Sequence, residues 1–208
     1  MNRDFIIKYF YELQKVMEEN MDYLINLDSI VGDGDLGLTM SDGFKAAYES
    51  IKETNETDIG KILYRAGKSM ANAVPSTMGT LMGSGLMHAG KALKNKNYLN
   101  EKDIISFFKY YNEGVTHRGK AKIGDKTFLD GMHPAIEAME LALSNEANIT
   151  EIANTALDFA TKGFNNTTTM IAKHGRAATR GKASRSLEDP GAAVAVLMMK
   201  AFKETVCS

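Results

Sequence analysis

Hydrophobic residues recur at three- and four-residue steps along most of the chain, the spacing that places them on one face of an α-helix. The first such run extends from Phe5 to Leu24 and predicts one long amphipathic helix, which stops at an aspartate-rich loop. Runs that alternate with period two, the signature of strands, are missing. The pattern therefore predicts an all-α protein with about eight helices.

Capping signals place the remaining helices. Asp58 can cap one helix, Asn100 with Asp103 resembles a capping box, and Asp189 precedes a proline at the first helical position, Pro190. Most connections are short, which is typical of antiparallel neighbours. The helices after the first are predicted over residues 38–51, 58–73, 79–93, 100–115, 132–143, 150–170 and 190–202.

Three longer stretches lack helical periodicity: residues 75–79, 119–130 and 173–189. They are rich in Gly, Arg, Lys and Asp, and we expect function there. No linker, repeat or low-complexity tract divides the chain, and 208 residues suit one large domain. We therefore assign a single domain over residues 1–208.

Composition narrows the class of protein. A hydrophobic content of 44% and a net charge of −1 indicate a globular protein without the basic excess of a nucleic-acid binder. The chain has no run of 18 apolar residues and no signal-peptide core, so we expect no membrane partner. The lone cysteine, Cys207, excludes an internal disulfide. These features together predict a cytoplasmic protein.

The aspartate-rich loop offers candidate metal ligands. Asp28, Asp33 and Asp35 lie close together in sequence, and Gly32 and Gly34 allow the tight bends that bring side chains to one point. Close carboxylates repel one another unless a cation lies among them, and hard oxygen ligands suit Mg²⁺ or Ca²⁺. The loop does not follow the ligand order of an EF-hand, so magnesium with a phosphate ligand is favoured. A solvated acidic turn is the alternative interpretation.

Two segments offer donors for a phosphate. Gly37, Leu38 and Thr39 open a helix, whose free N–H groups suit an anion, and residues 74–80 also lead into a helix. The second segment can also be an ordinary proline turn, and it is not a Walker loop. Residues 118–127 and 174–178 supply cations, which can form a solvated basic face or, for Arg176, contact a nucleotide.

Four blocks of sequence together resemble the nucleotide-binding subunit of dihydroxyacetone kinases, the DhaL type. The resemblance covers essentially the whole chain, in order and with similar spacing. It implies an antiparallel barrel of eight helices with the nucleotide at one rim. The blocks are Asp28 with Gly32-Asp33-Gly34-Asp35-Leu36-Gly37-Leu38-Thr39-Met40, Arg118-Gly119-Lys120-Ala121 with Gly124-Asp125-Lys126-Thr127, Gly175-Arg176-Ala177, and Asp189-Pro190-Gly191-Ala192.

The same resemblance implies the roles of individual residues. Asp28, Asp33 and Asp35 would hold two Mg²⁺ ions that bridge the phosphates of ADP or ATP. The residues implied at the phosphates are Leu36, Gly37, Leu38, Thr39, Thr77 and Met78, and those implied around the nucleoside are Gly119, Phe128, Arg176, Asp189, Pro190 and Gly191.

The resemblance also implies a division of labour. A separate subunit would hold a small ketone on a histidine, and a phosphotransferase-system protein would recharge the bound ADP, since the ATP-using type usually fuses both domains. Leu36 stands where the family usually has histidine, and Thr77-Met78 where it often has Ala-Ser. A paralogue for another ketose and a nucleotide-loaded regulatory module therefore stay open as alternatives. A fatty acid kinase domain is disfavoured by the chain length, and a homodimer is left open.

Overall fold

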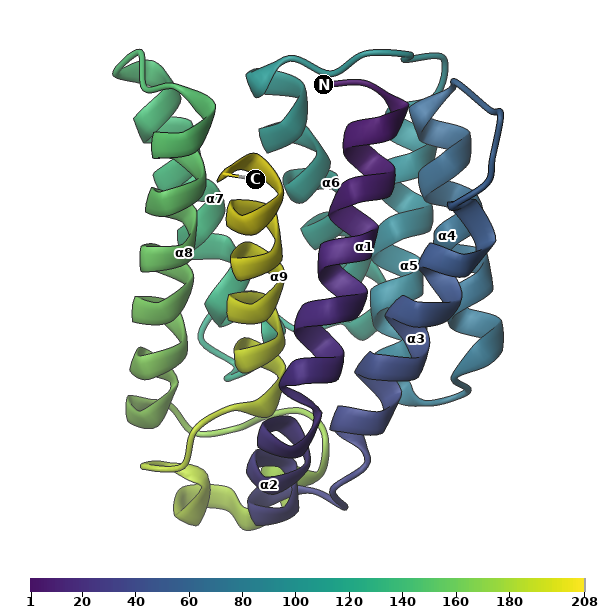
Figure 1. Cartoon of the computed structure of the whole chain (residues 1–208). Coiled ribbons are helices and arrows are strands. Elements are labelled where there is room, and N and C mark those ends of the chain that lie inside the picture. Colours follow the sequence, from purple (N-terminus) through teal and green to yellow (C-terminus); the bar gives the residue numbers. More distant parts are fainter. Residues whose placement is uncertain (208) are drawn as a thin grey trace.

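The computed structural model describes residues 1–207, and these residues form helices and connections without a β-strand (Figure 1). The all-α prediction is confirmed. The helices are α1 (Arg3–Glu19), α2 (Met21–Val31), α3 (Leu36–Ile51), α4 (Ile59–Ala73), α5 (Thr77–Ala92), α6 (Glu101–Gly119), α7 (Phe128–Ser144), α8 (Ile149–Asn166) and α9 (Pro190–Cys207), with short 3₁₀ segments η1 (Thr167–Thr169) and η2 (Arg176–Ser184) between the last two.

Helix α2 continues the course of α1, and the other successive helices run antiparallel and close into a barrel, in which α1 packs against both α3 and α9 (Figure 1). One hydrophobic core contains side chains from every α-helix of this set. Its centre is aromatic: the ring of Tyr9 lies 6.0 Å from that of Phe108 and 6.2 Å from those of Phe107 and Phe202. The interior is therefore filled by side chains.

The antiparallel order sorts the connections into two groups. Residues 32–35, 74–76, 120–127 and 167–189 lie at one end of the barrel, which we call the aspartate end (Figure 1). Residues 52–58, 93–100 and 145–148 lie at the other, the terminal end, together with both chain termini. All the irregular stretches in which the sequence predicts function thus meet at the aspartate end.

The prediction of one continuous first helix is wrong, because the helix breaks at Asn20. There the backbone leaves the helical region, and both the backbone N–H and the side-chain Nδ2 of Asn20 donate to the carbonyl of Val16, at 3.2 and 2.7 Å. The apolar spacing continues through Met17, Met21 and Leu24, so the pattern carries no sign of the break. Counting α1 and α2 as one broken helix restores the predicted eight.

Most other boundaries shift by about a turn, and the largest shift is at the end of α9, which continues beyond Phe202 to Cys207. Helix α3 begins at Leu36 instead of Leu38, α5 begins at Thr77 instead of after Gly79, and α8 ends at Asn166 instead of near Met170. The predicted caps at Asp58, Asn100 with Asp103, and Asp189 are confirmed. Within residues 1–207, none of the helices combines the length and the apolar character needed to cross a membrane.

Candidate functional site

The three aspartates predicted as metal ligands come together at the aspartate end. Asp28 lies in the last turn of α2, Asp33 in the connection, and Asp35 immediately before α3. One carboxylate oxygen from each lies within 4.8 Å of the others. Gly34, with φ of +76°, makes the turn between them, and its N–H donates to Asp28 Oδ2 at 2.9 Å. Three hard oxygen donors at this spacing fit a divalent cation.

The three carboxylates of this cluster lie in different surroundings. Burial raises the pKa of Asp28 above its ordinary value; the backbone N–H groups of Leu36 and Gly34 oppose the shift, and the charges of Asp33 and Asp35 add to it. Asp35 stands at the N-cap position of α3, yet its side chain makes no capping hydrogen bond. Since a capping aspartate normally uses its carboxylate on the helix, Asp35 keeps its oxygens available for a ligand.

Close packing of two helices holds the cluster together. A Cβ atom on Gly37 would collide with the carbonyl oxygen of Met21 and would lie 2.7 Å from Cγ1 of Ile25. Any other residue would therefore push the start of α3 away from α2. Because Asp28 is on α2 and Asp35 at the start of α3, Gly37 sets the distance between the two carboxylates.

The first turn of α3 supplies backbone donors beside the aspartates. The N–H of Thr39 donates to the carbonyl oxygen of Asp35 at 2.9 Å, so the N–H groups of Leu36, Gly37 and Leu38 precede the first intrahelical bond. The side chain of Leu36 is buried, with 4% of its surface exposed, and Thr39 is buried as well. Position 36 therefore has no polar side chain, and its backbone N–H bonds to the carboxylate of Asp28, so the free donors of this turn are the N–H groups of Gly37 and Leu38.

Helix α5 begins at the same end of the barrel. Its cap is Ser76, whose hydroxyl accepts from the N–H of Gly79 at 3.0 Å, so Thr77 and Met78 form the first turn. Gly119, at the end of α6, lies beside this helix, because a Cβ on Gly119 would be 3.1 Å from the side chain of Leu81. Thr77, Met78 and Gly119 thus belong to one stretch of the rim.

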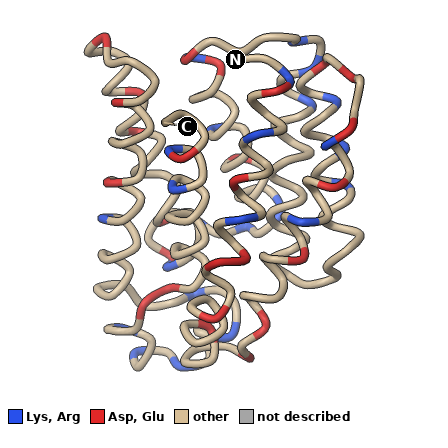
Figure 2. Tube along the Cα trace, viewed as in Figure 1, with Lys and Arg blue, Asp and Glu red and all other residues tan. Residues whose placement is uncertain are grey.

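Arg176 lies next to the aspartates although it is distant in sequence. It opens η2, and its guanidinium Nη2 is 2.6 Å from Asp33 Oδ2. The exposed fraction of the side chain is 69% for Arg176 and 42% for Asp33. In the Cα trace of Figure 2, positions of Lys and Arg in the connection between α8 and α9 lie beside positions of Asp and Glu at the aspartate end. The pair shows that η2 borders the aspartate cluster.

The other residues expected around the nucleoside lie deeper. A Cβ on Gly191 would lie 3.0 Å from the backbone N of Phe128, which places the starts of α9 and α7 in contact. The ring of Phe128 is buried and lies 6.0 Å from that of Tyr111. Asp189 is buried too and caps α9 by accepting from Ala192 at 2.7 Å; burial raises its pKa to about 7. Phe128 and Asp189 are therefore buried beneath the rim, where the starts of α7 and α9 meet.

Asp125 was not singled out by sequence reasoning, although it lies in a block that carries the resemblance. Its carboxylate accepts from Lys173 Nζ at 2.6 Å and from the N–H of Lys122 at 2.8 Å, and it contacts His174 Nε2 at 3.1 Å. These bonds, with the Lys173 ammonium foremost, lower its pKa to about 2. Asp125 therefore ties the connection between α6 and α7 to the one between α8 and α9.

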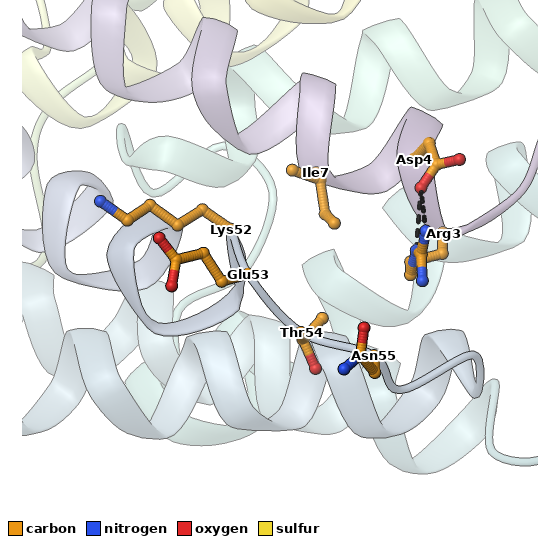
Figure 3. Close-up of a pocket in the computed structure, with 7 residues that line it drawn as sticks. All are labelled: Arg3, Asp4, Ile7, Lys52, Glu53, Thr54 and Asn55. Atoms are coloured by element: carbon orange, nitrogen blue, oxygen red, sulfur yellow. Dashed lines mark hydrogen bonds and ion pairs between the residues drawn. The ribbon is translucent and has the colours of Figure 1, made fainter.

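Two pockets elsewhere lack a comparable set of groups. One lies at the terminal end, between the pair of Arg3 and Asp4, 2.8 Å apart, and residues 52–55 on its opposite side (Figure 3). The other lies between α5 and α6, where His88 Nε2 is 3.7 Å from Glu113. Within residues 1–207, Asp28, Asp33 and Asp35 form the one group of three or more His, Cys, Asp or Glu side chains close enough to share a metal ion.

Comparison with known proteins identifies the relatives of this chain. The model of the DAK2 domain family matches residues 30–204. The ADP-binding subunit DhaL of the PEP-dependent dihydroxyacetone kinase of Escherichia coli is 30% identical over 200 residues, which cover 96% of this chain and 95% of that protein. The L-erythrulose 1-kinase of Mycolicibacterium smegmatis is 30% identical over 96% of this chain, which spans 35% of that enzyme.

A solved structure supports the same assignment at the level of the fold. The dihydroxyacetone kinase of C. freundii, in complex with AMP-PNP and Mg²⁺, matches 95% of this chain with a TM-score of 0.71 and 21% identity, over 33% of that chain. The expected helical barrel is thereby confirmed. The family match and the nearly full-length relatives show that this chain belongs to the DAK2 domain family and is a homologue of dihydroxyacetone kinase subunits.

Proposed function

We propose that this chain is the nucleotide-binding subunit of a small-ketose kinase, in which ADP stays bound and the phosphoryl group passes to a ketone held by a partner subunit. The observation that carries the proposal is the meeting of Asp28, Asp33 and Asp35 beside the first turn of α3. A group of carboxylates that can bind metal ions, next to free backbone N–H groups that can bind phosphate, is the arrangement that a metal–nucleotide complex needs.

Each group has a role in this mechanism. Asp28, Asp33 and Asp35 would hold two Mg²⁺ ions, which when bound supply the positive charge that stabilises a transferring phosphoryl group. The N–H groups of Gly37 and Leu38 orient the phosphates through hydrogen bonds, as the start of α5 can do from the other side. Arg176, already beside Asp33, is placed to pair with a phosphate and exclude water.

The partners follow from the relatives and from the chemistry. The E. coli relative is named as the ADP-binding subunit of a PEP-dependent kinase. We infer two partners for this chain: a ketose-binding subunit and a phosphotransferase-system protein that recharges ADP. Since the acceptor would be held by the other subunit, that subunit selects the ketose. Erythrulose kinases among the relatives make a four-carbon ketose a candidate beside dihydroxyacetone.

Thermal unfolding tests the nucleotide site directly. ADP and Mg²⁺ together should raise the melting temperature, because a ligand that binds the folded state stabilises it by mass action. Neither should act comparably alone, since the phosphates and the carboxylates complete the metal shell together. Mass spectrometry of the nucleotide that copurifies with the chain identifies the ligand. Equal shifts with ADP in the presence and absence of Mg²⁺ would contradict the bridged site.

Reconstitution tests the division of labour. The chain alone with ATP should leave free dihydroxyacetone and erythrulose unphosphorylated, because two subunits must hold donor and acceptor in line. Turnover should appear when a ketose-binding subunit and a phosphotransferase-system donor are added, with ADP needed only in catalytic amounts. Labelled phosphate in the product, with each component omitted in turn, gives the answer. Failure with every ketose while the nucleotide stays bound would favour the regulatory module.

A further inference from the structure

Lys126 is a buried lysine at the aspartate end. It lies in the connection between α6 and α7, directly before the N-cap residue Thr127, and 2% of its surface is exposed. Its backbone φ of +64° is in the left-handed region, which residues other than glycine rarely adopt. Burying an ammonium group is costly unless hydrogen bonds and nearby charge compensate it. The ammonium group of Lys126 therefore needs hydrogen-bond acceptors in the interior.

The ammonium group bonds to the connection between α8 and α9. Lys126 Nζ donates to the carbonyl oxygen of Ser184 at 2.6 Å and to that of Leu187 at 2.5 Å. Burial lowers the pKa of Lys126, and the nearby carboxylate of Asp189 opposes that shift. The bonds thus join segments that are 58 and 61 residues apart in sequence. Ser184 is the last residue of η2, and Leu187 lies three residues beyond it.

Asp125 and Lys126, which are neighbours in sequence, bond to the two ends of the segment around η2 in the connection between α8 and α9. Asp125 binds Lys173 and His174, directly before η2, and Lys126 binds the carbonyls at and beyond its end. Arg176 lies between these attachments and reaches Asp33. The glycines on either side of the arginine, Gly175 and Gly181, have positive φ values, and a Cβ atom added to either would meet nothing within 4 Å. The segment is therefore held at its two ends by Asp125 and Lys126. Between them Ala177 packs with Val31 and Ala172, and the N–H of Ser186 donates to the carbonyl oxygen of Thr168 at 2.9 Å.

We propose that Lys126 is a positioning residue for the nucleotide site: by bonding the carbonyls of Ser184 and Leu187, it fixes residues 176–187 so that Arg176 faces the aspartate cluster. The inference rests on the proposed function for its effect on nucleotide binding. Its structural part, the placement of residues 176–187, stands independently. Lysine suits the task because its ammonium group can donate to several carbonyls at once.

Lys126→Met tests the placement without any ligand. The substitution keeps the length of the side chain and removes the donors. Hydrogen exchange of residues 176–187, followed by mass spectrometry, should become faster, while exchange in α3 and α7 stays unchanged. Lys122→Met is the matched control, because Lys122 is exposed in the same connection and bonds Asp125 through its backbone. Unchanged exchange in residues 176–187 of a folded Lys126→Met protein would overturn the proposal.

A double-mutant cycle tests whether Lys126 acts through Arg176. Calorimetry should show roughly ten-fold weaker binding of ADP with Mg²⁺ to Lys126→Met. This is the smaller of the losses in affinity that are typical when a residue that orients a ligand-binding side chain is removed. In an Arg176→Ala background the same change should cost less than about two-fold, because the arginine to be positioned is gone. Equal losses in both backgrounds would mean that Lys126 acts through general stability and would overturn the proposal.

A second variant and the ligand-free measurement separate a failure of this proposal from a failure to fold and from a failure of the proposed function. If Lys126→Met does not fold, Lys126→Gln, which keeps a neutral donor, undergoes the same exchange and calorimetry experiments under the same criteria. If the wild-type chain does not bind ADP with Mg²⁺, the proposed function fails. The exchange measurement on the ligand-free proteins then still decides whether Lys126 positions residues 176–187.

Discussion

Asp58 and Asp35 occupy the same position at opposite ends of the barrel, the residue before the first turn of a helix. At the terminal end, Asp58 Oδ1 accepts from the N–H of Lys61 at 3.2 Å and Oδ2 accepts from that of Asn95 at 3.0 Å. At the aspartate end, Asp35 makes no capping bond and turns toward Asp28 and Asp33. The first carboxylate is used to stabilise the fold, and the second is left free for a ligand.

The backbone shows the same contrast between the two ends. All the glycines with positive φ in residues 1–207, Gly34, Gly124, Gly175 and Gly181, lie in connections of the aspartate end. The helices that begin at the terminal end have capping boxes or cap bonds at Asp58, Asn100 and Asn148. At the aspartate end Ser76, Thr127 and Asp189 also cap helices, whereas Asp35 makes no cap bond. Proteins commonly sacrifice local stability where a site must be built, and make up for it elsewhere. The following substitutions break or sharpen this comparison.

Asp35→Asn should have the largest effect, on binding alone. Removing one carboxylate from the cluster should weaken the binding of ADP with Mg²⁺ by at least about 100-fold. Loss of a residue that only hydrogen-bonds to a metal ligand already weakens metal binding by roughly 10- to 100-fold. The melting temperature of the ligand-free protein should not fall, because the substitution relieves repulsion and removes no cap bond. Asp42→Asn, on the exposed face of α3, is the control for calorimetry. Unchanged affinity in Asp35→Asn would exclude the metal site.

Gly37→Ala and Gly60→Ala form a matched pair across the two ends. A Cβ on Gly60 would lie 2.5 Å from the carbonyl oxygen of Gly90, a collision of the same kind as that between Gly37 and Met21. Each substitution should lower the free energy of unfolding by about 1–3 kcal/mol through overpacking. Only Gly37→Ala should also weaken nucleotide binding, because it separates Asp28 from Asp35. Urea unfolding and calorimetry on both variants measure the difference.

Asp58→Ala should reduce stability and leave binding intact. The loss of the N-cap should cost about 1 kcal/mol in urea unfolding. Asp58→Asn keeps an oxygen that can accept from the N–H of Lys61, so it should cost less. Affinity for ADP with Mg²⁺ should stay within experimental error in both variants. A fall in affinity would show that the two ends of the barrel are coupled.

Asp125→Asn should have the smallest effect at neutral pH, below about 1 kcal/mol, because its Lys173 partner is exposed. The difference should appear in acid. The folded pKa of Asp125, about 2, lies below its ordinary value of 3.8, so its contribution to stability is complete above pH 3.8 and is lost as pH falls through 2. Unfolding curves of the wild type and the variant should therefore converge between pH 4 and pH 2. Parallel curves would contradict the assigned bonds.

Periodicity and caps predicted most of the fold, because helices of this length are specified locally. Asp58, Asn100 and Asp189 mark helix starts that the structure confirms. The break at Asn20 escaped prediction because it depends on one side-chain bond to Val16, while the apolar spacing continues across it. The antiparallel order then determines which connections share an end of the barrel.

The site was only partly predictable. Asp28, Asp33 and Asp35 are neighbours in sequence, so their convergence follows from local geometry. The pair between Arg176 and Asp33 joins segments whose approach depends on the whole barrel, and only the resemblance to a family pointed to Arg176. The burial of Lys126 could not be read from a run of basic residues, since its neighbours Lys120 and Lys122 are exposed.

The up-and-down course of the helices has a practical consequence for single-molecule work. Cys207, at the exposed end of α9, is the sole thiol of the chain. It lies at the terminal end, with the length of the barrel between it and the aspartates (Figure 1). A maleimide dye or a surface tether can therefore be attached at one defined point without touching the aspartate end. Partner subunits could then be watched as they arrive at and leave an immobilised chain.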